Sequence, residues 1–203
     1  MAESLSQNFN HLKIHTQYSI CEGAAKIDDL QVYSKINKLK SLGLCDTSNL
    51  CGALEFAEKI SKSGTQPIIG TQINFKIGET TGLLPLFALN ENGYKNIIDL
   101  SSSSYLKNDE ISDPHVNFNE LLNNSDGVAI FSGTVFGLFG KLFDKGKFTE
   151  IDELYSKIKN TFDDRFYLEI QRHNDQNEIG FEKFNLKKSL DLFKLNFSKP
   201  TSF

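Results

Sequence analysis

The stretch FNHLKIHTQYSICEGAAKIDDLQVYSKINKLKSL, residues 9–42, contains the alternation from which a fold can be predicted. Its first part, FNHLKIH, is a short apolar run of the kind that forms a strand. From Asp29 to Leu42, apolar side chains recur about every third residue behind a pair of aspartates, which is typical of an amphipathic helix with an acidic cap. A strand followed directly by a helix is the building unit of α/β proteins.

The same alternation continues along the chain. Further strands are expected at LGLCD (42–46), PIIGTQINFKI (67–77), LLPLFAL (83–89), GVAIFSG (127–133) and FYLEIQRH (166–173). Further helices are expected at 52–64, from 91 to the serine run at 101–104, and at 118–124, 135–146, 148–158 and 185–197, with a loop at 107–117. The pattern predicts one domain over residues 1–203. Its sheet is expected to be largely parallel, with 11–15, 42–46 and 67–75 as parallel neighbours.

Length, charge and cysteine content narrow the class of protein. A chain of 203 residues with 39% hydrophobic and 24% charged residues is expected to fold around its own core. The net charge of −4 disfavours nucleic-acid binding by this chain alone. The three cysteines form no CxxC pair, the N-terminus lacks the features of a signal peptide, and no apolar run could cross a membrane. We therefore expect reduced thiols, no membrane and a cytoplasmic location.

The first strand and the turn after it carry residues that could bind a metal. His11 and His15 are four residues apart, so on a strand they would share a face, and Glu22 follows them. Lys13 lies between the histidines, and a protonated lysine cannot be a ligand. Structural histidines are the competing interpretation. Glycine-rich phosphate-binding motifs are absent.

Three more polar residues are candidates for the same cleft because they lie at the ends of predicted strands. Asp46 ends LGLCD, and it could equally be a helix N-cap. Glu169 and His173 lie on FYLEIQRH, where the glutamate could equally form an ion pair.

The order of several segments resembles a known family. HLKIHTQYSICEGAAK, LGLCDTSNLCGALEF, QPIIGTQINF, LLPLFALNENGYKNII, GVAIFSG and FYLEIQRHN follow one another as in the polymerase-and-histidinol-phosphatase (PHP) domain that begins bacterial DNA polymerase III alpha subunits. The resemblance covers roughly Phe9 to Asn174, and residues 175–203 match little, as if diverged or truncated. It implies a distorted seven-stranded α/β barrel, incomplete at the C-terminus.

The resemblance also implies a degenerate metal site. Metal-binding members carry three metals at the C-terminal ends of the barrel strands. Of the ligand positions that can be carried over, His15 and Glu22 keep liganding side chains. The degenerate positions are Lys13, Thr47, Gln72, Leu83 and Thr134. No cofactor is therefore expected, although zinc, manganese or magnesium would bind an intact site, and Lys13 is expected to replace a cation beside Glu22 or Asp46.

By resemblance, the parent protein is a DNA-directed DNA polymerase, a nucleotidyltransferase whose catalytic palm residues are absent from this chain. The expected role is that of a structural module in DNA replication that docks the proofreading exonuclease. Its partners would be the remainder of the polymerase alpha subunit and that exonuclease, with DNA reached only through the full polymerase. The alternative is a metal-dependent PHP phosphoesterase, like histidinol phosphatase or a proofreading nuclease, with ligands from His11, His115 or His173. A third possibility is a diverged reading frame with a non-native C-terminal end.

Overall fold

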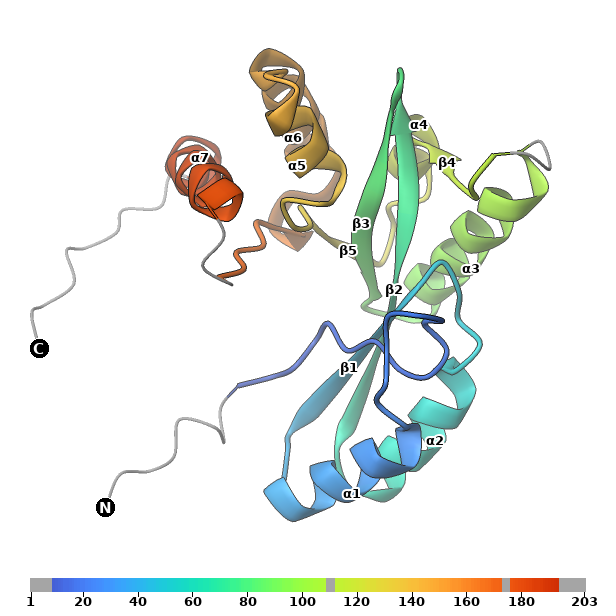
Figure 1. Ribbon diagram of the computed structural model, residues 1–203. Coiled ribbons are helices and arrows are strands. Elements are labelled where there is room, and N and C mark those ends of the chain that lie inside the picture. Colours follow the sequence, from blue (N-terminus) through green and yellow to red (C-terminus); the bar gives the residue numbers. More distant parts are fainter. Residues whose placement is uncertain (1–8, 109–111, 173–175, 194–203) are drawn as a thin grey trace, which may run out of the picture.

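The computed structural model of the protein describes residues 9–108, 112–172 and 176–193, and it shows a mixed sheet flanked by helices (Figure 1). The strands are β1 Ser41–Thr47, β2 Gln66–Ile77, β3 Thr80–Ala88, β4 Val116–Asn117, β5 Val128–Phe131 and β6 Phe166–Tyr167. The helices are α1 Ile27–Asn37, α2 Ala53–Lys62, α3 Glu91–Leu106, α4 Phe118–Asn123, α5 Leu138–Asp144, α6 Phe148–Phe162 and α7 Gln176–Phe193, with a 3₁₀ turn at Asp163–Arg165. The predicted α/β class is confirmed.

The strands form a six-stranded sheet in the order β1-β2-β3-β5-β6, with β4 paired to β2, and it does not close within the described residues. The β1–β2, β2–β4 and β5–β6 pairs are parallel, whereas β3 runs antiparallel to both β2 and β5. The predicted parallel pairing is thus found in three of the five strand pairs, and β3 is the exception. The reason is local, because Gly78 and Glu79 alone connect β2 to β3, and two residues can only reverse the chain.

The segment 11–15 is not one of the strands of the sheet, which corrects the first strand prediction. It nevertheless runs beside β1, where the Gly43 amide donates to the His11 carbonyl at 2.7 Å and the Cys45 amide donates to that of Ile14 at 2.8 Å. A side chain at Gly43 would meet the backbone of Leu12, so this close approach requires glycine. The parallel pairing of 42–46 with 67–75 is confirmed from Leu42 opposite Pro67 onward.

Several helix and strand boundaries differ from the predictions, among them those of α1, α3, β6 and α7. Helix α1 begins at Ile27 rather than Asp29 and ends before Lys38, which has a φ of 49°. Helix α3 continues through the serine run, where Ser104 Oγ donates to the Ser101 carbonyl at 2.7 Å. Strand β6 has two residues, and α7 begins nine residues before the predicted 185. Residues 194–197 of that predicted helix lie outside the described residues.

The buried apolar side chains form one large and two smaller clusters. The largest joins β2, β3 and β5 to α3, α5 and α6, and the second joins β1 to α1 and α2, with Leu50 in contact with both. Helix α7 packs onto α5 through Phe143, whose ring lies 5.5 Å from Phe181 and 5.4 Å from Phe184. The boundaries of a single domain remain a prediction.

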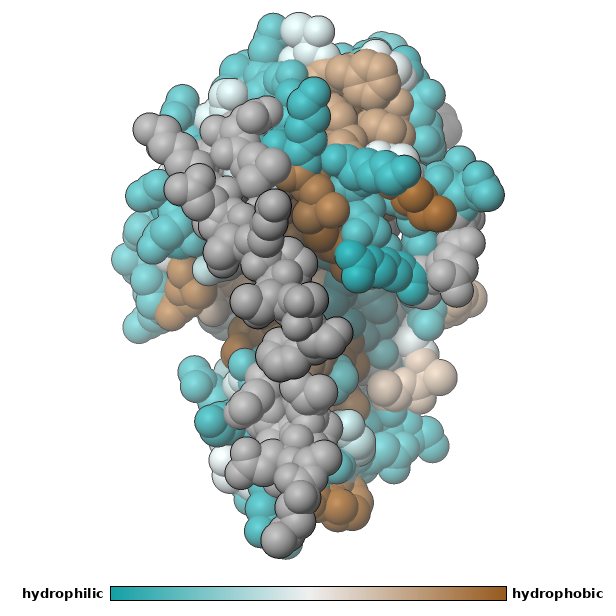
Figure 2. Space-filling view, turned by 90° about the vertical axis from the view of Figure 1, so that its left-hand side faces the viewer, coloured by the Kyte–Doolittle hydropathy of each residue, from teal (hydrophilic) through white to brown (hydrophobic). Residues whose placement is uncertain are grey.

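Figure 2 shows the side of the molecule that carries α7. Its described residues are mostly hydrophilic there, and the hydrophobic ones form small separate patches. Among the described residues, no helix combines the length and apolar character that crossing a membrane requires.

Candidate functional site

A cavity of about 520 Å³ lies between the segment after residue 11 and the segments that leave the carboxyl ends of β5 and β6. The 11–25 segment, β2, β3 and the segments that follow β5 and β6 all contribute to its wall. Its lining residues are Lys13, His15, Glu22, Gln72, Leu83, Pro85, Gly133, Thr134, Phe136, Gly137 and Gln171. Carboxyl ends of strands are the usual place for binding sites in α/β proteins.

The cavity brings together most of the ligand positions that the sequence singled out. Those in its wall are Lys13, His15, Glu22, Gln72, Leu83 and Thr134. Thr47, at the end of β1, is joined to the cavity by hydrogen bonds to two of its lining residues. Whether these residues can hold a metal depends on which hydrogen bonds and ion pairs their polar atoms already make.

One group of polar side chains is linked through Thr47. Its hydroxyl donates a short hydrogen bond to the Glu22 carboxylate. The same hydroxyl oxygen accepts from Gln72 Nε2 at 2.8 Å. The carboxylate that could have bound a cation is therefore hydrogen-bonded to a neutral neighbour, and the Gln72 side chain is a neutral amide rather than a carboxylate.

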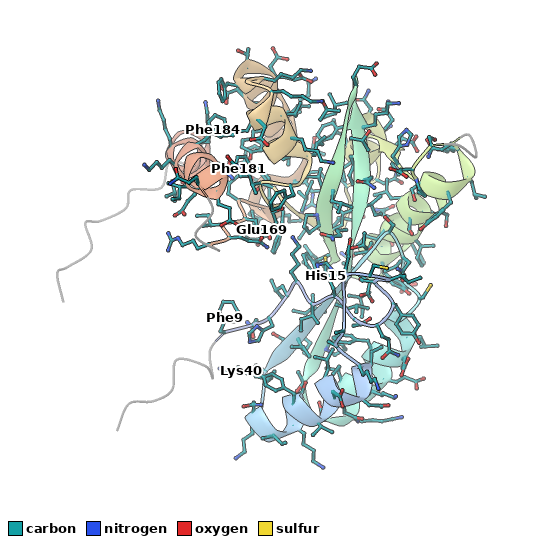
Figure 3. All side chains as sticks on the ribbon, in the orientation of Figure 1. Phe9, His15, Lys40, Glu169, Phe181 and Phe184 are labelled. Carbon is teal, nitrogen blue, oxygen red and sulfur yellow. The ribbon has the colours of Figure 1, made fainter. Side chains whose placement is uncertain are left out.

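A second group is centred on Glu169. Its Oε1 lies 3.1 Å from Lys13 Nζ and accepts from Gln171 Nε2 at 2.9 Å. The side chains of Lys13 and Glu169 are only 18% and 11% exposed, so this ion pair is largely removed from water. The prediction that Lys13 approaches Glu22 or Asp46 is wrong, because Glu22 is bonded to Thr47 and Asp46 to neutral donors. Figure 3 shows Glu169 and His15 on facing segments.

Asp46 lies beneath the cavity and is fully buried. Its carboxylate accepts hydrogen bonds from the Thr16 amide at 2.6 Å, from Thr16 Oγ1 at 2.7 Å and from Ser19 Oγ at 2.7 Å. Ser19 Oγ in turn accepts from the Thr47 amide at 3.0 Å. Asp46 is therefore neither a helix cap nor part of the cavity wall. It fixes the turn that carries His15 and Glu22.

The other histidines do not join His15. His11 is exposed and packs its ring edge-on against Phe9, with the ring centroids 4.9 Å apart. Residues 11–15 form no regular strand, so a spacing of four does not bring the two side chains together. His115 interacts through Nδ1 with the Asp113 carbonyl at 2.8 Å. His173 lies outside the described residues.

Several residues of the cavity were not identified from the sequence. Gln171 lies two positions after Glu169, a spacing that could have indicated a shared face of an extended segment. The loop after β5 supplies Phe136, which is 70% exposed at the cavity.

Beneath the site, Cys45 is fully buried, and this burial raises the pKa of its thiol. It is therefore an unreactive thiol rather than a ligand.

Two polar atoms at the site have no hydrogen-bond partner within the described residues although both are buried, namely His15 Nδ1 and Glu169 Oε2. No group of three or more His, Cys, Asp or Glu side chains in the described ranges could hold a metal ion. The donor set does not fit a metal cluster, because two ligands, His15 and Glu22, stand beside the ammonium group of Lys13.

Residues 11–173 match the family described as the PHP domain, and the chain belongs to this family. A solved structure of a candidate metal-dependent phosphoesterase from Bifidobacterium adolescentis has a similar fold. Its TM-score is 0.57 at 12% identity, over 91% of this chain and 84% of that one. At this level of identity the likeness supports the fold alone.

The chain is also similar to curated DNA polymerase III alpha subunits. It is 36% identical to that of Caulobacter vibrioides over 182 residues, which are 85% of this chain and 16% of the relative. It is 32% identical to that of Borreliella burgdorferi over 200 residues, which are 93% of this chain and 17% of the relative. The chain thus spans about a sixth of the length of these relatives.

Proposed function

We propose that this chain serves as a metal-free PHP module of a replicative DNA polymerase alpha subunit, with a structural role rather than a catalytic one. The similarity to DNA polymerase III alpha subunits supports the assignment to DNA replication. In such a protein, nucleotidyl transfer is the work of residues outside this chain. DNA is then reached through the whole polymerase, and the location is cytoplasmic.

The observation that carries the proposal is the pairing of the polar groups in the cavity. Glu22 is bonded to Thr47, and Glu169 is bonded to Lys13 and Gln171. Leu83 and Pro85 add hydrocarbon to the same wall. Apart from His15, whose Nδ1 has no partner within the described residues, these side chains are engaged with one another, which supports a module that keeps its shape without a metal.

A cation would be disfavoured at this site for an electrostatic reason. The Lys13 ammonium lines the cavity and would repel a divalent ion, and it is held there by a largely buried ion pair. His15 and Glu22 are two ligands, whereas a zinc site in a protein generally has three or four. We therefore propose that the cavity is the remnant of a metal site. Its seven positions are His15, Glu22, Lys13, Thr47, Gln72, Leu83 and Thr134.

The partners follow from the same assignment. The remainder of the polymerase alpha subunit is the first, because the chain matches only about a sixth of its relatives. The second is the proofreading exonuclease, since PHP domains without metals dock it in some replicases. Co-purification of the full alpha subunit with an exonuclease subunit, with and without this module, tests the second partner.

Elemental analysis tests the metal-free state. The protein is purified without chelator, supplied with zinc and manganese, desalted and analysed for bound metal, with a His15→Gln, Glu22→Gln variant as the matched control. We expect both proteins to retain the same background, well below one equivalent. Retention of one equivalent or more by the unmodified protein alone, together with manganese-dependent hydrolysis of p-nitrophenyl phosphate, would establish the phosphoesterase alternative instead.

A further inference from the structure

A second hollow, of about 180 Å³, lies at the tip of the β2–β3 hairpin. Three parts of the fold form it, namely the hairpin tip, the β4–α4 junction and α6, and Figure 1 shows the tip between the last two. Along β2, Ile77 at this tip lies five residues beyond Gln72 in the cavity wall, which is about 17 Å for an extended strand. The hollow is therefore separate from the candidate metal site.

The polar groups around this hollow are mainly hydrogen-bond donors. Lys76 comes from β2 and Lys157 from α6, and both side chains are exposed. Within the described residues, neither ammonium group has an ion-pair or hydrogen-bond partner. Two like charges at the edge of one small hollow repel each other, and an anion between them would remove that repulsion.

Two asparagines add amide donors. Asn117 lies directly opposite Lys76 in the β2–β4 register, and its Oδ1 accepts from the Asn119 amide at 2.9 Å. The Asn117 carbonyl oxygen is therefore already used, and its NH₂ group is left to donate. The Asn119 side chain also lines the hollow. These amides supply uncharged donors beside the two cations.

The remaining lining residues fix the shape of the hollow. Phe118 and Leu154 are buried and form its apolar base, and Gly78, with a φ of 53°, makes the tight turn at its edge. Two acidic residues lie close in sequence, Glu79 beside the turn and Glu153 one helical turn before Lys157, and neither is among the lining residues. Their negative charges make the electrostatic potential at the hollow less positive, so an anion is expected to bind weakly and with an affinity that falls as salt is added.

We infer that this hollow binds a phosphate group, held by Lys76 and Lys157 with the amides of Asn117 and Asn119. Tetrahedral oxyanions accept several hydrogen bonds at once, and bonds from ammonium groups to phosphate oxygens are the strongest that these side chains can make. The phosphate could belong to a small molecule or to the backbone of a nucleic acid, since the recognising chemistry is the same. This inference does not depend on the proposed function.

A nuclear magnetic resonance titration of the whole 203-residue chain with inorganic phosphate tests the inference, with chloride exchanged to hold the ionic strength constant. We expect saturable shifts at Gly78 and Asn119 in the unmodified protein. In the Lys76→Gln, Lys157→Gln variant, the dissociation constant should rise by about tenfold or more. A Lys62→Gln, Lys95→Gln variant removes the same charge from exposed positions on α2 and α3, and it should bind like the unmodified protein.

The outcome that overturns the inference is equal phosphate affinity in all three proteins, or shifts that never saturate. A second titration, with a short single-stranded DNA that lacks terminal phosphates, identifies the source of the phosphate. Shifts at the same two residues would assign the hollow to backbone phosphodiesters. Shifts with inorganic phosphate alone would assign it to free or terminal phosphate groups.

Discussion

Two polar networks meet at the carboxyl end of β1, and they differ in the partners that their charged groups have. The network around Asp46 is fully buried and consists of a carboxylate with three neutral donors. The network in the cavity is partly exposed and contains an ion pair, Lys13 with Glu169. The first holds a turn in place, whereas the second includes positions that we propose are the remnant of a metal site. Adjacent residues, Asp46 and Thr47, thus belong to networks with different roles.

The largest effect is expected from Asp46→Ala. The substitution leaves the Thr16 amide, Thr16 Oγ1 and Ser19 Oγ without their acceptor in a buried place, which should lower the free energy of unfolding by about 3 kcal/mol. Urea denaturation followed by circular dichroism measures this loss. Asp46→Asn keeps one acceptor oxygen and should lose less. Equal losses for both variants would contradict the assigned hydrogen-bond pattern.

A smaller effect is expected when the cavity ion pair is broken. Lys13→Met leaves a mostly buried Glu169 carboxylate with the amide of Gln171 alone, and it should cost about 2 kcal/mol because the remaining exposure moderates the penalty. Adding Glu169→Gln should recover most of the lost stability, since the unpaired buried charge is then gone. A double-mutant cycle measured by denaturation gives the coupling. If the two losses are additive, the pair does not interact as described.

Thr47→Val should have a smaller effect still. It removes the hydroxyl that joins Glu22 to Gln72 at a half-exposed position, so water can replace the lost bonds, and the cost should stay below about 1 kcal/mol. Thermal denaturation measures the change. A loss as large as that of Asp46→Ala would mean that the cavity and the buried network act as one unit.

No change in metal content is expected from Lys13→His alone, because Glu22 stays hydrogen-bonded to Thr47, and Thr47, Gln72 and Leu83 supply no ligand to complete a site. Combining Lys13→His with Thr47→His, Gln72→Glu and Leu83→His should allow one zinc to bind, since enough ligands then converge on one cavity. Metal analysis after desalting compares the two variants. Zinc bound by the single variant would show that the site is closer to intact than we propose.

The two networks also differ in how well the sequence predicted them. Six of the seven ligand positions carried over from the family line one cavity, and the seventh, Thr47, is bonded to it, because motif order fixes which strand ends meet. The partner of Lys13 was not predictable, since Glu169 is 156 residues away and nothing local indicates the pairing. The role of Asp46 was missed for the same reason, as its donors belong to a turn 27 to 30 residues earlier.

By itself, the sequence determined most of the succession of strands and helices, the α/β class and the residue types at the candidate ligand positions, because periodicity and short motifs are local properties. The tertiary structure alone decided which polar groups pair in the cavity and that Asp46 holds the turn below it. It also decided that Lys76 and Lys157 face one hollow from separate elements. Such contacts depend on how distant segments pack, and burial then determines whether each polar group needs a partner.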